Sequence, residues 1–359
     1  MFGQRLRLAR KKAGLSMREL AGRMSPKISA QAVSKYESGG MMPSSAVLVG
    51  LAKTLDVSMD FLMGGRVEAL RGIEFRKHSG TSARDRAKAE AIVTEALEAY
   101  LAIEDILGLE PPGDAFGDIA VDRVGTYAEV DALAGKLRER WNLGNDPVPS
   151  MVGLLEDRGV RVIEADLPER FDGLACDVVC GGGRPGTAVV VVSSRTGVER
   201  KRFNLAHELA HRVVRAAGNP EIRLEKAVDR FAGAFLVPAE HLAGEAGGRR
   251  QGMTYRELMR LKRLYGVSAA AMLMRLGQAG VLPQPVIAYA FRSYARSWRR
   301  EEPEPILDGE GFGAFERAER FEQLVWRALG EQLIPPLRAA QLLSRPLADL
   351  EREIRGPRG

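Results

Sequence analysis

The sequence has little cysteine and no long apolar run. Its 359 residues include two cysteines, Cys176 and Cys180, too few for the disulfide framework of a small secreted domain. On an expected strand both would point to one face; they could bind metal, but buried reduced thiols are the usual case. No apolar run approaches the roughly 20 residues that cross a bilayer. With no signal peptide recognised, we expect a cytoplasmic protein without a membrane partner.

Histidine is also scarce, which gives weight to one short motif. Two of the four histidines stand in a His-Glu-x-x-His pattern within the apolar segment 202–214. On a helix, residues four apart share a face, so His207 and His211 direct both imidazoles at one point. Glu208 then lies where a carboxylate can reach a water on the same metal. The pattern can arise by chance, but no Pro or Gly interrupts its flanks. We predict one Zn²⁺ per chain, with Glu208 as the base.

The segment 224–238, LEKAVDRFAGAFLVP, offers a third ligand. A catalytic zinc usually has three protein ligands and an open position for water. Glu225 and Asp229 are four apart on an expected helix. Glu225 can supply the carboxylate ligand, and Asp229 can accept the free ring N–H of a ligating histidine. The alternative is an ordinary amphipathic helix with two acids on its polar face, but the spacing after the histidine motif favours the ligand interpretation.

Together these segments resemble the ImmA/IrrE family of regulatory metallopeptidases. RFNLAHELAHRVV followed by E-x3-D-RFAGAFLVP carries the resemblance, and short strands are expected before it in GVRVIEADLPERFDGLACDVV and TAVVVVSS. The resemblance covers residues 125–282. It implies a zinc protease with a thermolysin-like ligand set that cleaves transcriptional repressors. It also implies the roles of its site residues: metal ligands His207, His211 and Glu225, general base Glu208, and Asp229 as the partner of a ligand. For the oxyanion, Tyr255, His241 and several arginines stay open.

The first 65 residues predict a separate module of five short helices. Ser16 and Glu19 form a capping box at the second helix, and Ser29 caps the third. The segments GLSMRELA, ISAQAVSKYESG and DVSMDFL resemble the Cro/C1-type (XRE) helix-turn-helix family over residues 3–64. The turn MSPKIS is slightly long for this family and can shift the third helix.

The third helix of this module is the expected DNA-reading element. It is predicted to present Gln31, Ser34 and Lys35 outward, toward base edges and phosphates, while Val33 and Tyr36 turn inward. Salt-dependent phosphate contacts are expected from the basic residues Arg5, Arg7, Arg10, Lys11, Lys12, Arg18 and Lys35. A small helical domain used only for protein contact is the alternative. The net charge of +6 fits a phosphate-bearing partner, although a GC-rich genome can also favour arginine.

A chain of this length is expected to hold two or three domains. We predict an α+β fold, mainly α with a small β-sheet. The expected parts are a helix-turn-helix domain (1–65), a helical linker (66–124), a zincin-like metallopeptidase domain (125–282), a linker (283–315) and a helical C-terminal region (316–359). Within the first linker, residues 81–108 predict one long helix with an apolar stripe, and residues 110–118 a turn-rich break.

Three functions are compatible with these features. The first is a DNA-binding transcription regulator with a zinc endopeptidase that cleaves a repressor or antitoxin partner. The second is a regulator or antitoxin that uses the peptidase fold as a sensor or partner platform without proteolysis. The third is a general peptidase with an incidental helix-turn-helix. The expected partners are a double-stranded DNA operator and a protein substrate. A homodimer is open, since helix-turn-helix proteins commonly pair.

Overall fold

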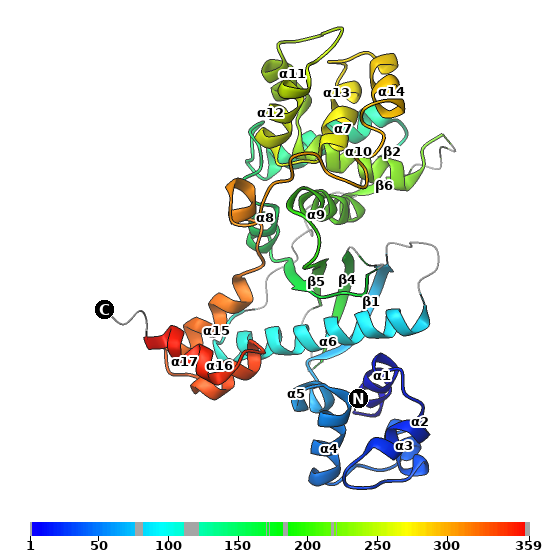
Figure 1. Ribbon diagram of the computed structural model, residues 1–359, viewed down its shortest axis with the longest axis vertical. Helices are drawn as coiled ribbons and strands as arrows, with labels where there is room; N and C mark the ends of the chain where they lie inside the picture. The colour runs from blue at the N-terminus through cyan, green and yellow to red at the C-terminus, as the bar shows by residue number, and fades with distance from the viewer. Residues whose placement is uncertain are drawn as a thin grey trace. The chain divides into compact units, whose positions relative to one another are not determined.

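The computed structural model of the chain describes residues 2–75, 82–110, 122–169, 171, 173–181, 186–216, 219 and 221–355. The chain forms two compact units: unit 1 comprises Met1–Gly113, Gly159–Ser194 and Ala318–Gly359, and unit 2 comprises Asp114–Arg158 and Arg195–Arg317. Helices predominate and the sheets are small, which confirms the predicted α+β class (Figure 1). Among the described residues, no helix has the length and apolar character needed to span a membrane. The break predicted at 110–118 lies, from residue 111 on, outside the described residues.

Unit 1 begins with five short helices around one apolar core. They are α1 (Phe2–Lys12), α2 (Met17–Arg23), α3 (Ala30–Glu37), α4 (Ser45–Leu55) and α5 (Met59–Met63). The capping box of α2 is present: Ser16 Oγ accepts the Glu19 backbone N–H at 3.2 Å, and a Glu19 carboxylate oxygen accepts the Ser16 N–H at 2.7 Å. Leu6, Leu20 and Val33 are fully buried, and each such side chain stabilises the module by about 1.5–3 kcal/mol.

A four-stranded sheet and the long helix α6 form the second part of unit 1 (Figure 1). The strands are β1 (Val67–Phe75), β3 (Arg161–Ala165), β4 (Gly173–Cys180) and β5 (Thr187–Ser193), in the order β1-β4-β5-β3. Strand β3 is parallel to β5, and the other two pairs are antiparallel. Helix α6 (Ala83–Ile106) packs Val93, Leu97 and Leu101 into the sheet's core. The two cysteines are buried on β4 and are not joined in a disulfide, as expected.

Strand β1 differs from the helical linker predicted over 66–124. Its sequence, VEALRGIEF, has no strong alternation, and Gly72 interrupts it at φ 61°. Pairing with β4, more than 100 residues later in the chain, satisfies backbone groups at the edge of β4 that would otherwise lack ladder partners. No local pattern in the sequence of residues 67–75 indicates that they pair with β4. The long helix predicted at 81–108 is present as α6.

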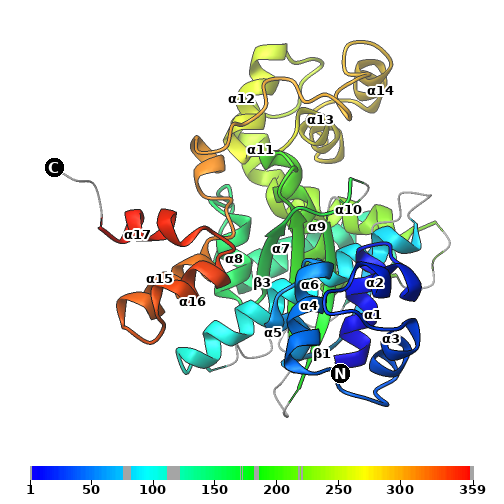
Figure 2. The ribbon, with the colours of Figure 1, turned by 60° about the horizontal axis from the view of Figure 1, so that its bottom comes forward.

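The C-terminal region forms three helices of unit 1: α15 (Arg320–Gly330), α16 (Pro336–Leu342) and α17 (Leu347–Arg355). In Figures 1 and 2 these orange and red helices lie against one end of α6. Tyr100 and Ile103 of α6 are buried in one core with Val325 and Ala328 of α15. The apolar stripe of α6 therefore packs on the sheet and on the C-terminal helices.

The described residues of unit 2 are helical or irregular apart from one short parallel pair of strands, β2 (Asp122–Val124) and β6 (Val214–Ala216). Its helices are α7 (Tyr127–Arg140), α8 (Met151–Asp157), α9 (Val198–Val213), α10 (Leu224–Leu236), α11 (Ala239–Ala246), α12 (Tyr255–Tyr265), α13 (Ala269–Gln278) and α14 (Gln284–Arg292), and a 3₁₀ turn, η1, spans Gly311–Ala314. The predicted linker 283–315 thus contains α14 and η1.

Helix α10 is held between α7 and α9 by its apolar face. Phe231 and Phe235 are fully buried, with ring centroids 5.9 Å apart in a stacked pair, and Trp141 meets Phe235 edge-on at 6.0 Å. Such aromatic pairs add about 0.5–1.5 kcal/mol to the burial energy. The apolar face of α10 turns inward, and its acidic residues Glu225 and Asp229 contact histidines of α9.

Candidate metal centre

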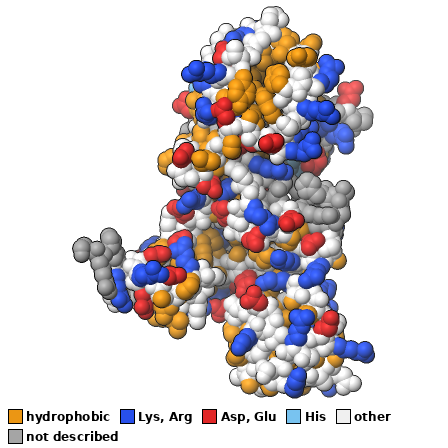
Figure 3. Space-filling view, in the orientation of Figure 1, with side chains coloured by type: hydrophobic (Ala, Val, Ile, Leu, Met, Phe, Trp, Pro, Cys, Tyr) orange, Lys and Arg blue, Asp and Glu red, His pale blue; other side chains and the backbone are white. Residues whose placement is uncertain are grey.

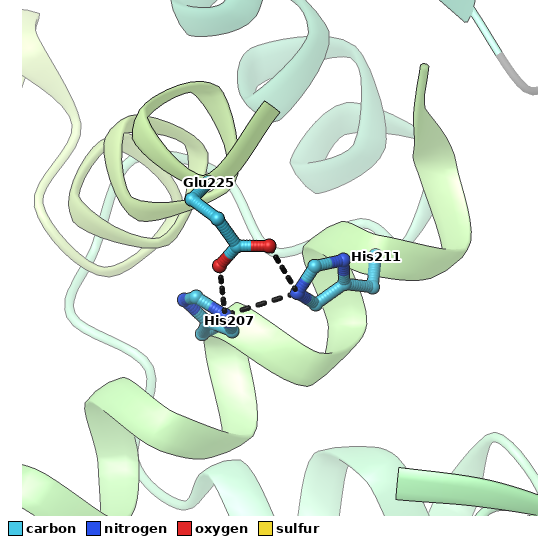
Figure 4. A group of neighbouring side chains, drawn as sticks. All are labelled: His207, His211 and Glu225. Carbon is cyan, nitrogen blue, oxygen red and sulfur yellow. Dashed lines mark hydrogen bonds and ion pairs between the residues drawn. The ribbon is translucent and has the colours of Figure 1, made fainter. Parts of the chain in front are cut away.

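The histidine motif lies on α9, a 16-residue helix. The helical repeat brings His207 and His211 to one face, and their Nε2 atoms are 3.0 Å apart (Figure 4). His207 is buried and His211 is partly buried. Leu205 and Leu209, on the apolar flank of the motif, are buried as well and anchor the helix. Both imidazoles therefore present one nitrogen to the same point, as the spacing predicts.

Glu225 reaches the two histidines from α10 (Figure 4). One of its carboxylate oxygens is 3.8 Å from His207 Nε2, and the other is 4.0 Å from His211 Nε2. Each of the three residues offers a donor atom within 4.8 Å of the others. A tetrahedral ion bound at about 2.0–2.1 Å separates its ligand atoms by about 3.3 Å. The observed separations of 3.0, 3.8 and 4.0 Å lie on both sides of this value, and the cluster could hold a metal ion.

Asp229 lies one turn after Glu225 and contacts the other ring nitrogen of His207. Its carboxylate accepts the Nδ1–H of His207 at 2.8 Å. With the proton held at Nδ1, the lone pair at Nε2 is directed to Glu225 and His211. This arrangement orients a ligating histidine and raises its basicity. The side chain of Asp229 is 57% exposed and that of Glu225 is 73% exposed, so the cluster is open to solvent on the α10 side.

Asp229→Asn is expected to weaken metal binding by about 10- to 100-fold, because the amide accepts the imidazole N–H less strongly than a carboxylate does. The measurement is a zinc dissociation constant from chelator competition, with Asp131→Asn as a control. Asp131 is also a partly exposed carboxylate of unit 2, but its partners are Arg230 and Arg275. Equal affinities for wild type and Asp229→Asn would show that the 2.8 Å contact does not support the ligand.

Glu208 follows His207 on α9 and is only 5% exposed. Among the described residues it is not a member of the three-donor cluster, which suits a base and not a ligand. The Glu208 carboxylate is therefore shielded from solvent, whereas the neighbouring three-donor cluster is open to solvent. This position is compatible with the predicted role of Glu208 as general base.

The candidates considered for oxyanion stabilisation have other partners. His241 Nδ1 is 2.7 Å from Tyr265 Oη, and its Nε2 is 3.8 Å from Asp146. Burial raises the pKa of the Tyr265 hydroxyl above its usual value, so that group stays protonated. Burial and the neighbouring Glu304 carboxylate also raise the pKa of the Tyr255 hydroxyl. Neither residue is brought to the cluster by these contacts.

A pocket of about 660 Å³ adjoins Asp229. Phe203 and Met274 supply apolar wall, and Lys226 and Arg230 line it from α10. The sequence patterns do not indicate this pocket, because its residues come from five separate helices and the segment after α14. Two residues of the pocket are close in sequence to predicted metal ligands: Phe203 stands four residues before His207, and Lys226 directly follows Glu225.

The predicted DNA-reading residues all lie on the exposed side of α3. Gln31, Ser34 and Lys35 are exposed, whereas Val33 and Tyr36 are buried. Ser29 caps the helix by accepting the Ala32 N–H at 3.1 Å, as predicted. Basic side chains are also visible on the face of this module drawn at the bottom of Figure 3.

Two arginines predicted to contact phosphate are instead structural. Arg5 is buried, pairs with Glu98 and donates to the carbonyl of Val67 at 2.5 Å. Arg10 donates to Glu37 at 2.5 and 2.9 Å. The inward face of α1 carries both side chains, and each satisfies a buried carboxylate there. A count of basic residues could not separate these two from the exposed cations Lys11, Arg18 and Lys35.

Comparisons with known families identify two segments of the chain. Residues 6–62 match the helix-turn-helix family model, and residues 155–277 match the model of the IrrE N-terminal-like domain, a peptidase family. No curated protein and no solved structure matches the chain. The second segment contains the motif on α9 together with Glu225 and Asp229. Both predicted resemblances are confirmed: the chain matches, from N- to C-terminus, an XRE-type helix-turn-helix family and the IrrE/ImmA-like family of metallopeptidase-type domains.

Proposed function

We propose that this chain is a DNA-binding transcription regulator whose zinc-dependent endopeptidase domain cleaves a protein partner, a repressor or an antitoxin. The observation that carries the proposal is the convergence of His207, His211 and Glu225, with Asp229 behind His207. The helix-turn-helix match supports DNA binding, and the peptidase match supports a protein substrate.

Zinc is the proposed metal, and manganese or iron could occupy the same donors. Two imidazole nitrogens and one carboxylate form a set found in catalytic zinc sites, whereas magnesium and calcium prefer oxygen ligands alone. Three protein ligands would leave one position open for water or substrate. When bound, the ion supplies Lewis-acid polarisation of a peptide carbonyl and acidifies a water.

The chain's own residues supply the proton transfers and the geometry. Glu208 accepts a proton from the attacking water on a carboxylate oxygen and donates it to the leaving amine. Asp229 keeps the proton of His207 on Nδ1, which leaves Nε2 free for the ligand role. The exposed α10 side of the cluster gives an extended polypeptide access to these groups.

The decisive experiment compares wild type and Glu208→Gln, both checked for bound zinc, on two kinds of substrate. One is the set of regulator proteins encoded beside this gene, and the other is a mixture of denatured proteins. Cleavage by wild type alone supports the proposal. If zinc is bound and every protein stays intact, the chain is a regulator that uses the peptidase fold as a sensor or partner platform.

On the DNA side, Lys35→Ala is expected to weaken binding to a mixed-sequence duplex. One lost phosphate contact reduces the slope of log affinity against log salt by about 0.9. Fluorescence anisotropy between about 50 and 200 mM salt measures this slope. Gln31→Ala is expected to keep the slope and to change the bases selected from a random library. Arg327→Ala, an exposed cation on α15, is the control. An unchanged slope for Lys35→Ala would remove Lys35 from the interface.

A further inference from the structure

Residues 302–316, here named the strap, pack on unit 2 through buried contacts, although their composition is that of a linker. The strap lies beyond the segment that matches the IrrE N-terminal-like domain. It contains η1 and ends at Glu316, which is 1% exposed. Its buried and partly buried contacts are with α8, α9, α12 and α13, and α9 carries both histidines of the candidate metal centre.

One end of the strap is joined to α9 by a buried ion pair. Glu316 pairs with Arg202, and both side chains are fully buried. The same carboxylate accepts the backbone N–H groups of Met151 at 2.7 Å and Val152 at 3.0 Å, at the start of α8. Glu316 therefore joins α8 and α9 through one carboxylate.

Arg202 has further partners that restrict its position. It donates to the carbonyl of Val148 at 2.6 Å and to that of Tyr265 at 3.3 Å. The ring of Phe312, in η1 of the strap, lies 4.2 Å from the guanidinium carbon. Burial lowers the pKa of Arg202 and raises that of Glu316, and the opposite charge of each residue counters the shift of the other. A shift of α9 along its axis would break several of these contacts at once.

The other end of the strap contacts a second buried pair, which joins α12 to α9. Lys262 of α12 donates to Glu199 of α9 at 2.6 Å and to the carbonyl of Glu304 at 2.7 Å. The same oxygen of Glu199 accepts the N–H of Ile306 at 2.8 Å. Glu302 pairs with Lys262 at 3.2 Å and caps α13 by accepting the Ala269 N–H at 2.8 Å.

These anchors act on the helix that carries the metal ligands. Arg202 precedes His207 by five residues, which is about 7.5 Å along a helix at about 1.5 Å per residue. Uncompensated charge at a fully buried position is strongly unfavourable, so buried pairs permit only the helix positions in which both partners meet. The position of Nε2 of His207 and His211 relative to Glu225 depends on that register.

We propose that the strap sets the register of α9 against α8 and α12, and that Arg202 and Glu316 are positioning residues for the metal-ligand cluster. The proposal uses the metal site of the proposed function but does not require that the chain cleaves protein. It predicts a change in the metal site when a residue far from the donors is altered.

The test measures zinc binding and cobalt absorption of the full-length chain. Glu316→Gln is expected to weaken zinc binding by about 10- to 100-fold in chelator competition, the range seen when groups that orient ligands are lost. The visible spectrum of the cobalt-loaded variant is expected to change, because it reports ligand geometry. Glu245→Gln, which removes an exposed ion pair with Arg260, should change neither quantity. Phe312→Ala keeps both buried charges paired and serves as the test variant if Glu316→Gln does not fold. It is expected to weaken zinc binding severalfold.

Hydrogen exchange separates this proposal from the proposed function. In the metal-free chain, Glu316→Gln or Phe312→Ala is expected to raise amide exchange across α9 and to leave α6 of unit 1 unchanged. If wild type binds no zinc, the proposed function fails, whereas faster exchange in α9 still supports the strap. Zinc affinity within twofold of wild type and unchanged exchange in a folded Phe312→Ala variant would overturn the strap proposal.

Discussion

Glu208→Gln is expected to keep the metal ion and to lower the rate of peptide hydrolysis by at least about 100-fold. General acid–base catalysis by one positioned side chain contributes about 10²- to 10⁴-fold. Glutamine has the same shape but cannot accept a proton from water or return one to the leaving amine. Because Glu208 is outside the three-donor cluster, the ligand set is unchanged by the substitution. Zinc content and single-turnover cleavage, measured on the same preparation, give both quantities.

The control for this variant is Glu221→Gln, which neutralises an exposed carboxylate four residues before Glu225. It should bind zinc and cleave as wild type does. If Glu208→Gln keeps zinc and cleaves at a rate within a few-fold of wild type, another group takes the proton. If it loses zinc, then Glu208 supports the site itself and the division between ligand and base is wrong.

Glu225→Ala is expected to lower zinc affinity by more than about 100-fold and to abolish hydrolysis. It removes one of three donors, which costs more than the 10- to 100-fold loss caused by changing a group behind a ligand. The two histidine nitrogens, 3.0 Å apart, would remain as a two-donor site with weaker binding. Isothermal titration and chelator competition measure the affinity, and far-UV circular dichroism checks that α9 and α10 are folded.

Glu221→Ala is the matched control, since it shortens an exposed glutamate near α10 without touching the cluster. A comparison with Asp229→Asn ranks the two carboxylates by their effect on zinc affinity: the Glu225 variant must lose more zinc affinity than the Asp229 variant. Affinity within tenfold of wild type for Glu225→Ala would exclude Glu225 as the third ligand, and Asp229 would then be the next donor to test because it already contacts His207.

Much of the metal centre could be predicted because its information is local. The i to i+4 spacing of His207 and His211 needs only a helix to become a shared face, and an uninterrupted apolar flank predicts that helix. The same spacing relates Glu225 and Asp229. That Glu225 lies within 4.0 Å of both imidazoles is different: it follows from the packing of α10 between α7 and α9, through residues such as Phe231 and Phe235.

The predictions that differ from the structure concern pairing between distant segments. Residues 67–75 have no strong strand pattern, yet they form β1 because β4 offers an edge. Arg5 is a basic residue of the kind that contacts phosphate, yet it is buried and paired with Glu98 of α6. The acidic, proline-containing strap has the composition of a linker, yet Lys262 and Arg202 provide buried partners for its carboxylates.

The amino-acid sequence alone determined the helices that carry the motifs, the caps at Ser16 and Ser29, and the two sets of motif residues, because periodicity and capping act over a few residues. Only the tertiary structure decided which charges are buried, that β1 pairs with the edge of β4, and how α9 and α10 bring their donors together. Those outcomes depend on desolvation and packing between segments that are far apart in the chain, and no local pattern encodes which partner each buried group meets.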